Sequence, residues 1–204
     1  MQSLPRVYPI TDVQLSGLSH PEQVRLLSLG GASLIQLREK RMSALEFYEQ
    51  AKAAQQSGVR LIINDRVDIA LAVGAAGVHL GQDDLSPEAA RKLLGPQAII
   101  GYSTHNINQA VNATTLPIDY LAVGPIFSTT TKTDTAPVLG LEGLRTVRQA
   151  ICGFPLVAIG GITRANARNV IEAGADSVAV ISALLSVPDQ ITSATQNLFA
   201  SCQT

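Results

Sequence analysis

The sequence has few of the residues that build disulfide scaffolds or nucleic-acid surfaces. Its 204 residues include two cysteines and no tryptophan, and aromatic residues make up only 4%. Cys152 and Cys202 form no metal or redox motif, so we expect a reduced, cytoplasmic setting. With 15 basic and 16 acidic residues the formal net charge is −1, which leaves no surplus of positive charge for a polyanion. Nucleic acid is therefore not an expected partner.

Several functional signatures are also missing. No apolar run reaches about 18 residues, the length that suggests a membrane-spanning helix, so we expect no membrane partner. The first residues lack the basic start and long apolar stretch of a secretory signal. We find neither the His/Cys spacing of a zinc site nor the nucleophile elbow of a serine hydrolase. His20 is expected in a loop, and His79 in the core with its hydrogen bonds satisfied.

What the sequence does contain is an alternation of two hydrophobic periods. Short runs rich in β-branched residues recur between segments with helical spacing, which predicts parallel strands joined by helical crossovers. Most of these runs are apolar on both faces, as expected when helices cover one side and a core fills the other. The eight predicted strands are residues 6–11, 33–37, 60–63, 77–80, 98–101, 120–124, 156–159 and 177–181.

Several predicted helices have recognisable starts. Ser43 opens a capping-box pattern, and Ser86 precedes a proline at the first helical position. Asn106 and Thr163 are expected to cap two more helices. Together the strands and helices fit an α/β fold, a single (β/α)₈ TIM barrel, over one catalytic domain of residues 1–204. The rival is an open doubly wound sheet, and the lack of a G-x-G-x-x-G motif after the first strand weighs against it.

In such a barrel, catalytic groups lie at the carboxyl ends of the strands and in the loops that follow. Alternation along the second strand places Gln36, Arg38 and Lys40 on one face, toward the mouth. An inward pair of cations needs an anion, and a phosphate or diphosphate suits both their charge and their geometry. The alternative is a solvated charge cluster just beyond the strand.

Carboxylates follow the third and fourth strands. Asp65 and Asp84 occupy neighbouring strand ends, so both can contribute oxygen ligands to one Mg²⁺, which favours few carboxylates together with substrate phosphate oxygens. The alternatives are that Asp65 caps the next helix and that Asp84 belongs to an ordinary acidic loop.

The later strand ends carry hydroxyls and glycines. A long Thr-rich loop with Lys132 follows the sixth strand and suits a phosphate or a lid, although a solvated loop is the alternative. Gly160 and Gly161 follow the seventh strand, and Ser182 follows the eighth, where barrels frequently bind phosphate. Two anion-binding regions and one metal site around a single mouth indicate either the joining of two phosphorylated substrates or the isomerisation of one.

The sequence resembles the thiamine-phosphate synthase (thiamine monophosphate pyrophosphorylase) family along nearly its whole length. The motifs that carry the resemblance coincide with the eight strand ends, which makes the set specific even though most motifs are modest singly. They are residues 8–12 (YPITD), 36–40 (QLREK), 64–66 (NDR), 78–84 (VHLGQDD), 101–103 (GYS), 124–127 (GPIF), 129–132 (TTTK), 159–162 (IGGI) and 181–182 (IS).

The resemblance implies a barrel enzyme that couples 4-amino-2-methyl-5-hydroxymethylpyrimidine diphosphate to a thiazole phosphate with Mg²⁺, giving thiamine monophosphate and diphosphate. By this likeness Arg38, Lys40 and Lys132 are the catalytic cations, and Asp65 and Asp84 bind the metal. The residues implied for the pyrimidine diphosphate are Gln36, Arg38, Lys40, Asn64, Ser103 and Lys132. Those implied for the thiazole phosphate are Thr129, Thr131, Gly161, Ile181 and Ser182.

Two rival functions stay open at this point. A thiazole tautomerase of the same superfamily needs one phosphate site and an acid/base group, for which His105 is the candidate. It has little use for Asp65 and Asp84 together with the two cations that follow the second strand. A regulator that binds thiamine phosphates needs the phosphate pockets but no metal-dependent turnover. The oligomeric state is not fixed by the sequence, and a homo-oligomer stays open.

Overall fold

The computed structural model describes residues 4–129 and 137–202. Eight parallel strands form one sheet in the order β1-β8-β7-β6-β5-β4-β3-β2. A bridge between Ile10 and Gln36 brings the two outer strands together, so the sheet is nearly closed into a barrel. The strands are β1 (Val7–Pro9), β2 (Leu34–Leu37), β3 (Arg60–Asn64), β4 (Gly77–Leu80), β5 (Ile99–Thr104), β6 (Tyr120–Val123), β7 (Leu156–Ile159) and β8 (Ser177–Val180).

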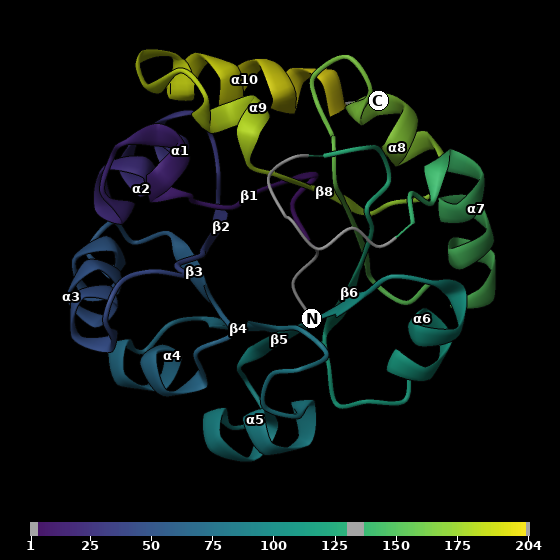
Figure 1. Cartoon of the computed structure of the whole chain (residues 1–204), viewed down its shortest axis with the longest axis horizontal. Helices are drawn as coiled ribbons and strands as arrows, with labels where there is room; N and C mark the ends of the chain where they lie inside the picture. The colour runs from purple at the N-terminus through teal and green to yellow at the C-terminus, as the bar shows by residue number, and fades with distance from the viewer. Residues whose placement is uncertain (1–3, 130–136, 203–204) are drawn as a thin grey trace.

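Helices surround this barrel on the outside (Figure 1). They are α1 (Val13–Ser16), α2 (His20–Leu29), α3 (Ala44–Gln55), α4 (Val67–Val73), α5 (Pro87–Leu94), α6 (Ile107–Ala113), α7 (Gly140–Ala150), α8 (Ala167–Glu172), α9 (Ser182–Leu185) and α10 (Ile191–Cys202), with a 3₁₀ turn at Pro188–Gln190. The predicted (β/α)₈ barrel is confirmed. The fifth strand continues to Thr104, three residues beyond its predicted end at Gly101. None of the helices in the described part of the chain has the length and apolar character needed to cross a bilayer.

Local sequence signals account for several helix starts. Ser43 forms the predicted capping box with Glu46, and the side chains of Ser86 and Asn106 each accept a backbone N–H of the first helical turn. The predicted cap at Thr163 is wrong, because α8 begins only after Asn166. His20 is also not a loop residue, since it is the first residue of α2 and is fully buried.

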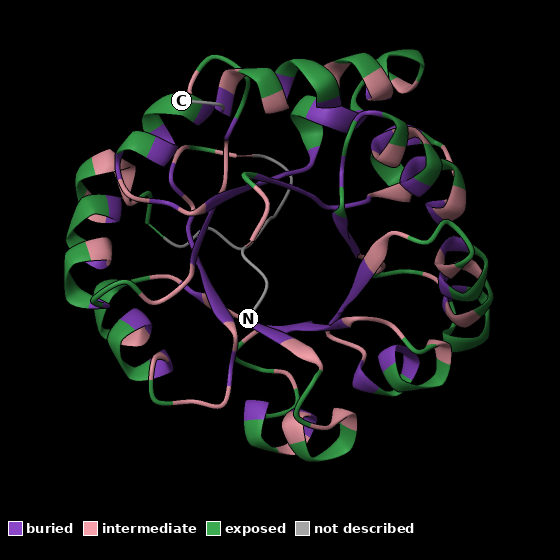
Figure 2. Ribbon diagram, turned by 180° about the vertical axis from the view of Figure 1, so that it is seen from behind, coloured by how far each residue is buried: buried purple, intermediate pink, exposed green. Residues whose placement is uncertain are grey.

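The core has two layers separated by the strands, which are buried on both faces (Figure 2). Between the strands and the helices lie aliphatic side chains such as Leu37, Ile63 and Val123, all fully buried. Inside the barrel lie larger and more polar side chains, among them Tyr8 and Tyr120. Polar side chains buried inside the barrel require hydrogen-bond partners, because unpaired buried groups are costly.

The amino-terminal rim of the barrel is held by two matching ion pairs. Arg91 lies 2.7 Å from Asp119, whose Oδ2 also accepts the N–H of Ile100 at the start of β5. Arg148 lies 2.6 Å from Asp176, and the same Oδ2 accepts a backbone N–H of β7. These pairs fix helix-to-strand junctions, so this rim contributes to the stability of the fold. The chemistry is expected at the opposite rim, where the strands end.

Candidate active site

Charged side chains converge at the carboxyl ends of β1 to β4. Lys40 Nζ lies 2.5 Å from Asp65 Oδ2, and the carboxyls of Asp65 and Asp84 are close enough to share a hydrogen bond. Arg38 Nη1 lies 3.8 Å from Asp12 Oδ2. Residues far apart in the sequence therefore meet at one rim, because all parallel strands end there.

The loop that presents the two cations is anchored by Glu39. Its Oε1 accepts the backbone N–H groups of Lys40 at 2.7 Å, Arg41 at 2.6 Å and Met42 at 3.2 Å. Its Oε2 lies 3.5 Å from the buried Nε2 of His20. The glutamate between the two cations thus turns away from the mouth and ties down the backbone that carries them.

Asp65 is placed by a strained backbone. It has a left-handed φ of 62°, a region that residues other than glycine seldom adopt, and its N–H donates to His79 O at 2.8 Å. Asp65 does not cap the next helix, since the residue at the cap position of α4 is Arg66, which makes no side-chain cap bond. In this backbone conformation the carboxylate of Asp65 meets Lys40 and Asp84.

Two carboxyls in contact affect each other's ionisation. Burial, followed by the hydrogen bond and charge of Asp65, raises the pKa of Asp84 above its ordinary value, although the Gly81 N–H and Lys40 oppose the shift. Asp84 Oδ2 accepts that N–H at 2.6 Å, so the loop after β4 folds back on the carboxylate. A nearby cation reduces the repulsion between two such carboxylates and favours the ionised form of both.

The described residues contain no group of three or more His, Cys, Asp or Glu side chains that would form a closed metal cage. Asp65 and Asp84 nevertheless fit Mg²⁺, because this ion takes one or two carboxylates and completes its shell with waters and substrate phosphate oxygens. The contact between two partly buried carboxyls is the observation that supports the fit.

Below the charged rim is a small cavity of about 20 Å³ inside the barrel. Among its lining residues are four of the side chains expected to hold the pyrimidine diphosphate, namely Gln36, Arg38, Asn64 and Ser103. Gln36 and Asn64 are buried, with 2% and 7% of their surface exposed. Ser103 also lines a second, larger cavity, so it stands where the two spaces meet.

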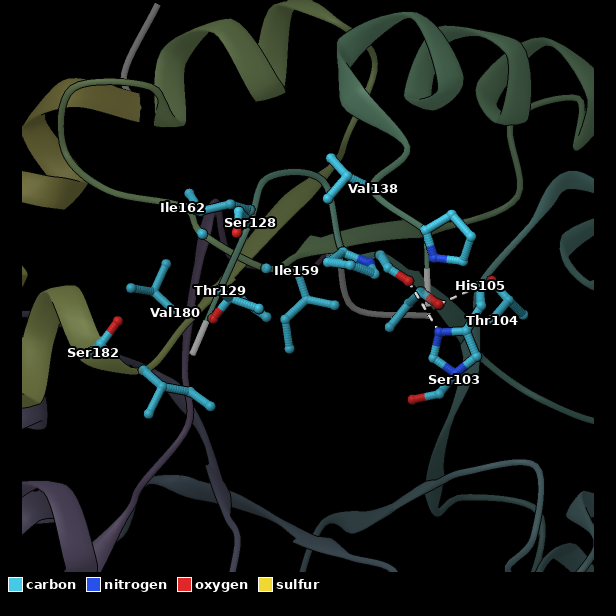
Figure 3. Close-up of a pocket in the computed structure, with 18 residues that line it drawn as sticks. Ser103, Thr104, His105, Ser128, Thr129, Val138, Ile159, Ile162, Val180 and Ser182 are labelled. Carbon is cyan, nitrogen blue, oxygen red and sulfur yellow. Dashed lines mark hydrogen bonds between the residues drawn. The ribbon is translucent and has the colours of Figure 1, made fainter. Parts of the chain in front are cut away.

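The larger cavity, of about 370 Å³, lies over the carboxyl ends of β5 to β8. Ser103, Thr104 and His105 lie on one side of it, and Val180 and Ser182 lie on the other (Figure 3). No lysine, arginine, aspartate or glutamate is found among its described lining residues, which instead offer hydroxyls, the His105 imidazole, apolar groups and backbone.

Gly160 and Gly161 form part of the wall of this cavity, and the structure shows why both are glycine. A Cβ on Gly160 would lie 2.6 Å from Pro125 Cβ, and one on Gly161 would lie 2.6 Å from Ser128 O. Their φ angles of 104° and 63° also favour glycine. The loop after β6 is bound to this turn, because Phe127 N–H donates to Gly160 O at 3.0 Å.

The structure brings most of the residues expected to hold the thiazole phosphate to the larger cavity. Thr129, Gly161, Ile181 and Ser182 all line it. Thr131 and Lys132 lie outside the described residues, so their placement stays a prediction.

Some residues near the site were not singled out by the sequence reasoning. Asp12, which faces Arg38, belongs to the YPITD run at the first strand end, so its position was a usable signal. His79 is a hydrogen-bonded core histidine as predicted, but it also reaches Ser103 Oγ at 2.9 Å. Alternation places it opposite Val78 and Leu80, on the barrel face of β4, and this pattern could have revealed the link.

Comparison with known proteins agrees with this geometry. The sequence profile of the family described as thiamine monophosphate synthase matches residues 7–184. The chain belongs to the thiamine monophosphate synthase family. Thiamine-phosphate synthase from Chloroflexus aurantiacus is 48% identical over 200 residues, which cover 96% of this chain and 91% of the relative. The protein of the same name from Koribacter versatilis is 50% identical over 196 residues, covering 92% of each chain.

A solved structure extends the likeness to three dimensions. Thiamine phosphate pyrophosphorylase from Pyrococcus furiosus aligns with a TM-score of 0.86 and 39% identity, covering 97% of this chain and 95% of that one. Membership in the thiamine monophosphate synthase family makes the chain a transferase of thiamine biosynthesis. The isomerase alternative is not favoured, because these relatives are named for synthesis of thiamine phosphate.

Proposed function

We propose that the chain joins 4-amino-2-methyl-5-hydroxymethylpyrimidine diphosphate to 4-methyl-5-(2-phosphooxyethyl)thiazole. The bond from the pyrimidine methylene carbon to the diphosphate oxygen breaks, and the thiazole nitrogen forms a new bond to that carbon. The products are thiamine monophosphate and diphosphate. The observation that carries the proposal is the convergence of Lys40, Asp65 and Asp84 at one rim, beside a separate uncharged cavity.

The charged half of the mouth is assigned to the diphosphate. Arg38 and Lys40 hold its oxygens and stabilise the negative charge that grows as it leaves, with Lys132 assigned the same role from the Thr-rich loop. Each described cation already faces a carboxylate, Asp12 or Asp65, so its position is set before substrate arrives. Departure of diphosphate before attack is favoured because the aminopyrimidine ring can delocalise the cation left on its methylene carbon.

Asp65 and Asp84 would hold Mg²⁺ at this rim. When bound, the ion neutralises charge on the phosphate oxygens and makes diphosphate a better leaving group. Lys40, within 2.5 Å of Asp65, ties this carboxylate pair to the cationic loop.

The uncharged half of the mouth is assigned to the thiazole phosphate. Its apolar lining, which includes Val138 and Ile159, suits an uncharged ring. Hydroxyls of Thr129 and Ser182, with the backbone near Gly161 and Ile181, are the proposed phosphate contacts, at the place where barrels frequently bind this group. The described wall holds no carboxylate to repel a phosphate.

A coupling assay tests the proposal. The purified chain, mixed with both phosphorylated substrates and Mg²⁺, is expected to release thiamine monophosphate and diphosphate, detected by chromatography. Omission of either substrate is the control. Tautomerisation of the thiazole without coupling would reject the proposal in favour of an isomerase. Binding of thiamine monophosphate without any turnover would reject it in favour of a regulator.

The setting of the reaction follows from simpler features. Cys152 and Cys202 are both free thiols, which suits a cytoplasmic enzyme. We propose that residues 1–204 act as one catalytic domain. The proposed substrate contacts all come from one chain, so the site requires no partner subunit. A homo-oligomer is compatible with this proposal.

A further inference from the structure

A line of hydrogen bonds crosses the barrel interior and ends on two of the proposed substrate-binding side chains. Gln36 Nε2 donates to the Tyr8 hydroxyl at 3.1 Å, and the Tyr8 and Tyr120 hydroxyls lie 3.0 Å apart. Tyr120 reaches His79 Nδ1 at 3.0 Å, and His79 Nε2 reaches Ser103 Oγ at 2.9 Å. We call these five residues the interior relay.

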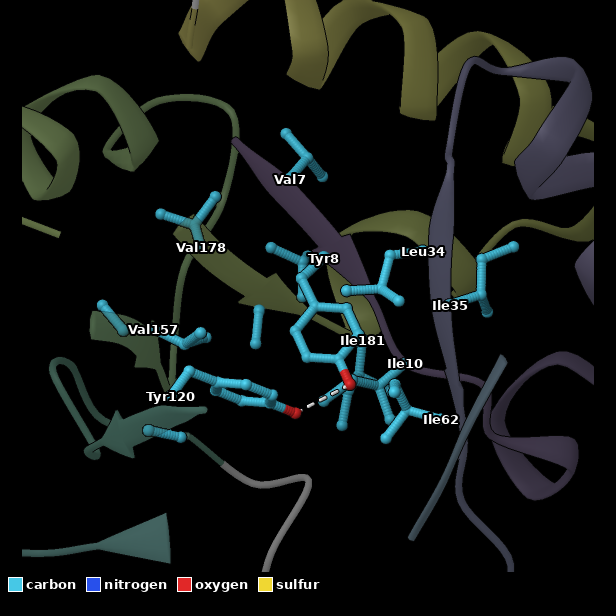
Figure 4. Close-up of a cluster of buried hydrophobic side chains, with 14 of the residues drawn as sticks. Val7, Tyr8, Ile10, Leu34, Ile35, Ile62, Tyr120, Val157, Val178 and Ile181 are labelled. Atoms are coloured by element: carbon cyan, nitrogen blue, oxygen red, sulfur yellow. Dashed lines mark hydrogen bonds between the residues drawn. The ribbon is translucent and has the colours of Figure 1, made fainter. Parts of the chain in front are cut away.

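The relay depends on a missing side chain. Gly101 of β5 pairs with His79 on one side and with Tyr120 on the other. A Cβ on Gly101 would lie 2.1 Å from Tyr120 Cζ and 2.4 Å from His79 Nδ1. Because Gly101 has no side chain, the rings of His79 and Tyr120 can stack across β5 with centroids 5.5 Å apart. The ring of Tyr8 meets that of Tyr120 edge-on, at 5.9 Å (Figure 4).

The Gln36 amide, which donates to Tyr8, suggests one direction for the hydrogen bonds of the relay. Tyr8 and Tyr120 are 1% exposed, and burial raises the pKa of both phenols, so both keep their protons. A buried hydroxyl hydrogen needs an acceptor. Because Tyr8 accepts from Gln36, we assign its own hydrogen to the Tyr120 oxygen and the Tyr120 hydrogen to His79 Nδ1. Nδ1 is then an acceptor, and a neutral His79 carries its proton on Nε2.

The end of the relay is the Ser103 hydroxyl. In this assignment His79 Nε2–H donates to Ser103 Oγ, and the hydrogen of that hydroxyl points away from the histidine. Ser103 lines both cavities and is half-buried, so its hydrogen is available to a ligand there. A serine whose oxygen accepts from a fixed donor keeps its own hydrogen available for a second partner.

We propose that Tyr120 and His79 are positioning residues that commit the Ser103 hydroxyl to donate to an acceptor atom of the aminopyrimidine diphosphate. The inference rests on the proposed function for the identity of the substrate. The tautomer of His79 is the device: with the proton on Nδ1 instead, Ser103 would donate to the ring and offer the substrate only lone pairs. The relay thus determines whether Ser103 acts toward the substrate as a hydrogen-bond donor or as an acceptor.

The first test reads the tautomer directly. The chain has three histidines, so ¹⁵N NMR of imidazole-labelled protein is tractable, and the His79→Gln spectrum assigns the signal. We expect neutral His79 to carry its proton on Nε2 in the wild type. In Tyr120→Phe, which removes the donor to Nδ1, the signal should move toward the other tautomer. A wild-type proton on Nδ1 would overturn the proposal.

The second test is kinetic. Tyr120→Phe should raise KM for the pyrimidine diphosphate about tenfold, the effect of one misdirected hydrogen bond, with KM for the thiazole phosphate within about twofold of wild type. Tyr48→Phe is the matched control, because Tyr48 lies on the outer helix α3 with its ring beside Lys52. Equal changes in both KM values, or no change in either, would reject the inference.

Two further variants guard against a merely structural effect. His79→Gln keeps an N–H donor that can reach Ser103, whereas His79→Leu does not, so glutamine should recover most of the pyrimidine KM that leucine loses. Tyr8→Phe removes a neighbouring hydroxyl but leaves the Tyr120–His79 bond intact, so it should leave the His79 tautomer unchanged. The two histidine variants provide the kinetic test if Tyr120→Phe does not fold. Equal KM values for the glutamine and leucine variants would count against the relay.

These outcomes separate the inference from the proposed function. A wild-type chain that does not couple the two substrates rejects the function, while the tautomer measurement still stands by itself. A wild-type chain that couples normally, with a Tyr120→Phe variant of unchanged tautomer and kinetics, rejects the relay alone.

Discussion

The two halves of the barrel mouth differ in how they prepare for an anion. The half at β1 to β4 carries full charges, and the two described cations assigned to the diphosphate each face a carboxylate: Arg38 faces Asp12 and Lys40 faces Asp65. The half at β5 to β8 has no lysine, arginine or carboxylate among its described lining residues and offers hydroxyls and backbone.

The difference matches the proposed ligands. A leaving diphosphate gains charge during the reaction, so charged groups held in place by fixed partners stabilise it most. The thiazole phosphate is bound but does not react, so its charge stays the same throughout the reaction. Hydroxyls and N–H groups that bind it equally in the ground state and the transition state are sufficient to hold it. We therefore expect substitutions in the first half to lower kcat and those in the second to raise KM.

The largest effect is expected at the carboxylate pair. Asp84→Asn should lower kcat by about 10³-fold, because one of two proposed metal ligands and its charge are lost. Asp83→Asn is the matched control, since Asp83 is the exposed neighbour in the same loop. Chelation of Mg²⁺ should reproduce the loss in the wild type. Coupling that proceeds equally well in excess chelator would remove the metal from the charged half.

A smaller effect is expected at the cationic loop. Arg38→Met should lower kcat with the pyrimidine diphosphate about 10²-fold and leave KM for the thiazole phosphate unchanged. Arg41→Met, three residues along the same loop, removes an exposed arginine that bonds Gln14 and should have little effect. Steady-state kinetics with each substrate varied in turn measures both. A rise in thiazole KM equal to the loss in kcat would contradict the division of the mouth.

The uncharged half is tested at its glycine turn. Gly161→Ala places a methyl group 2.6 Å from Ser128 O and should displace the loop that lines the cavity, raising KM for the thiazole phosphate about tenfold. Gly58→Ala shares the positive φ but meets nothing within 4 Å, so it controls for backbone strain of about 1 kcal/mol. Equal kinetic effects of the two variants would show that the clash is unimportant.

The smallest effect concerns the anchor beneath the cationic loop. Burial lowers the pKa of His20 below the ordinary 6.5, although Glu39 and Asp12 oppose the shift. The unfolded chain therefore takes up this proton at a higher pH than the folded one, and stability falls as the pH drops below about 6.5. Urea midpoints between pH 7.5 and 5 should fall more steeply for the wild type than for His20→Gln. Parallel slopes would show that His20 does not titrate on unfolding.

Much of the architecture was predictable from local patterns. The alternation of β-branched runs and helical spacing gave all eight strands, and capping at Ser43, Ser86 and Asn106 behaved as expected. Thr163 and His20 were misjudged for a common reason: whether a polar residue caps, turns or is buried depends on its neighbours in space. No local pattern shows that His20 is enclosed beside Glu39 and Thr11.

The sequence by itself determined the barrel and the rim at which the chemistry lies, because hydrophobic period is a local property and parallel strands joined by helices share one carboxyl end. Only the tertiary structure decided which partners those side chains meet. The Asp12–Arg38 pair, the contact of Asp65 with Asp84, and the ring of Tyr120 passing over Gly101 to His79 all join different strands. Such contacts depend on register and on the space left by a neighbour, which no single strand encodes.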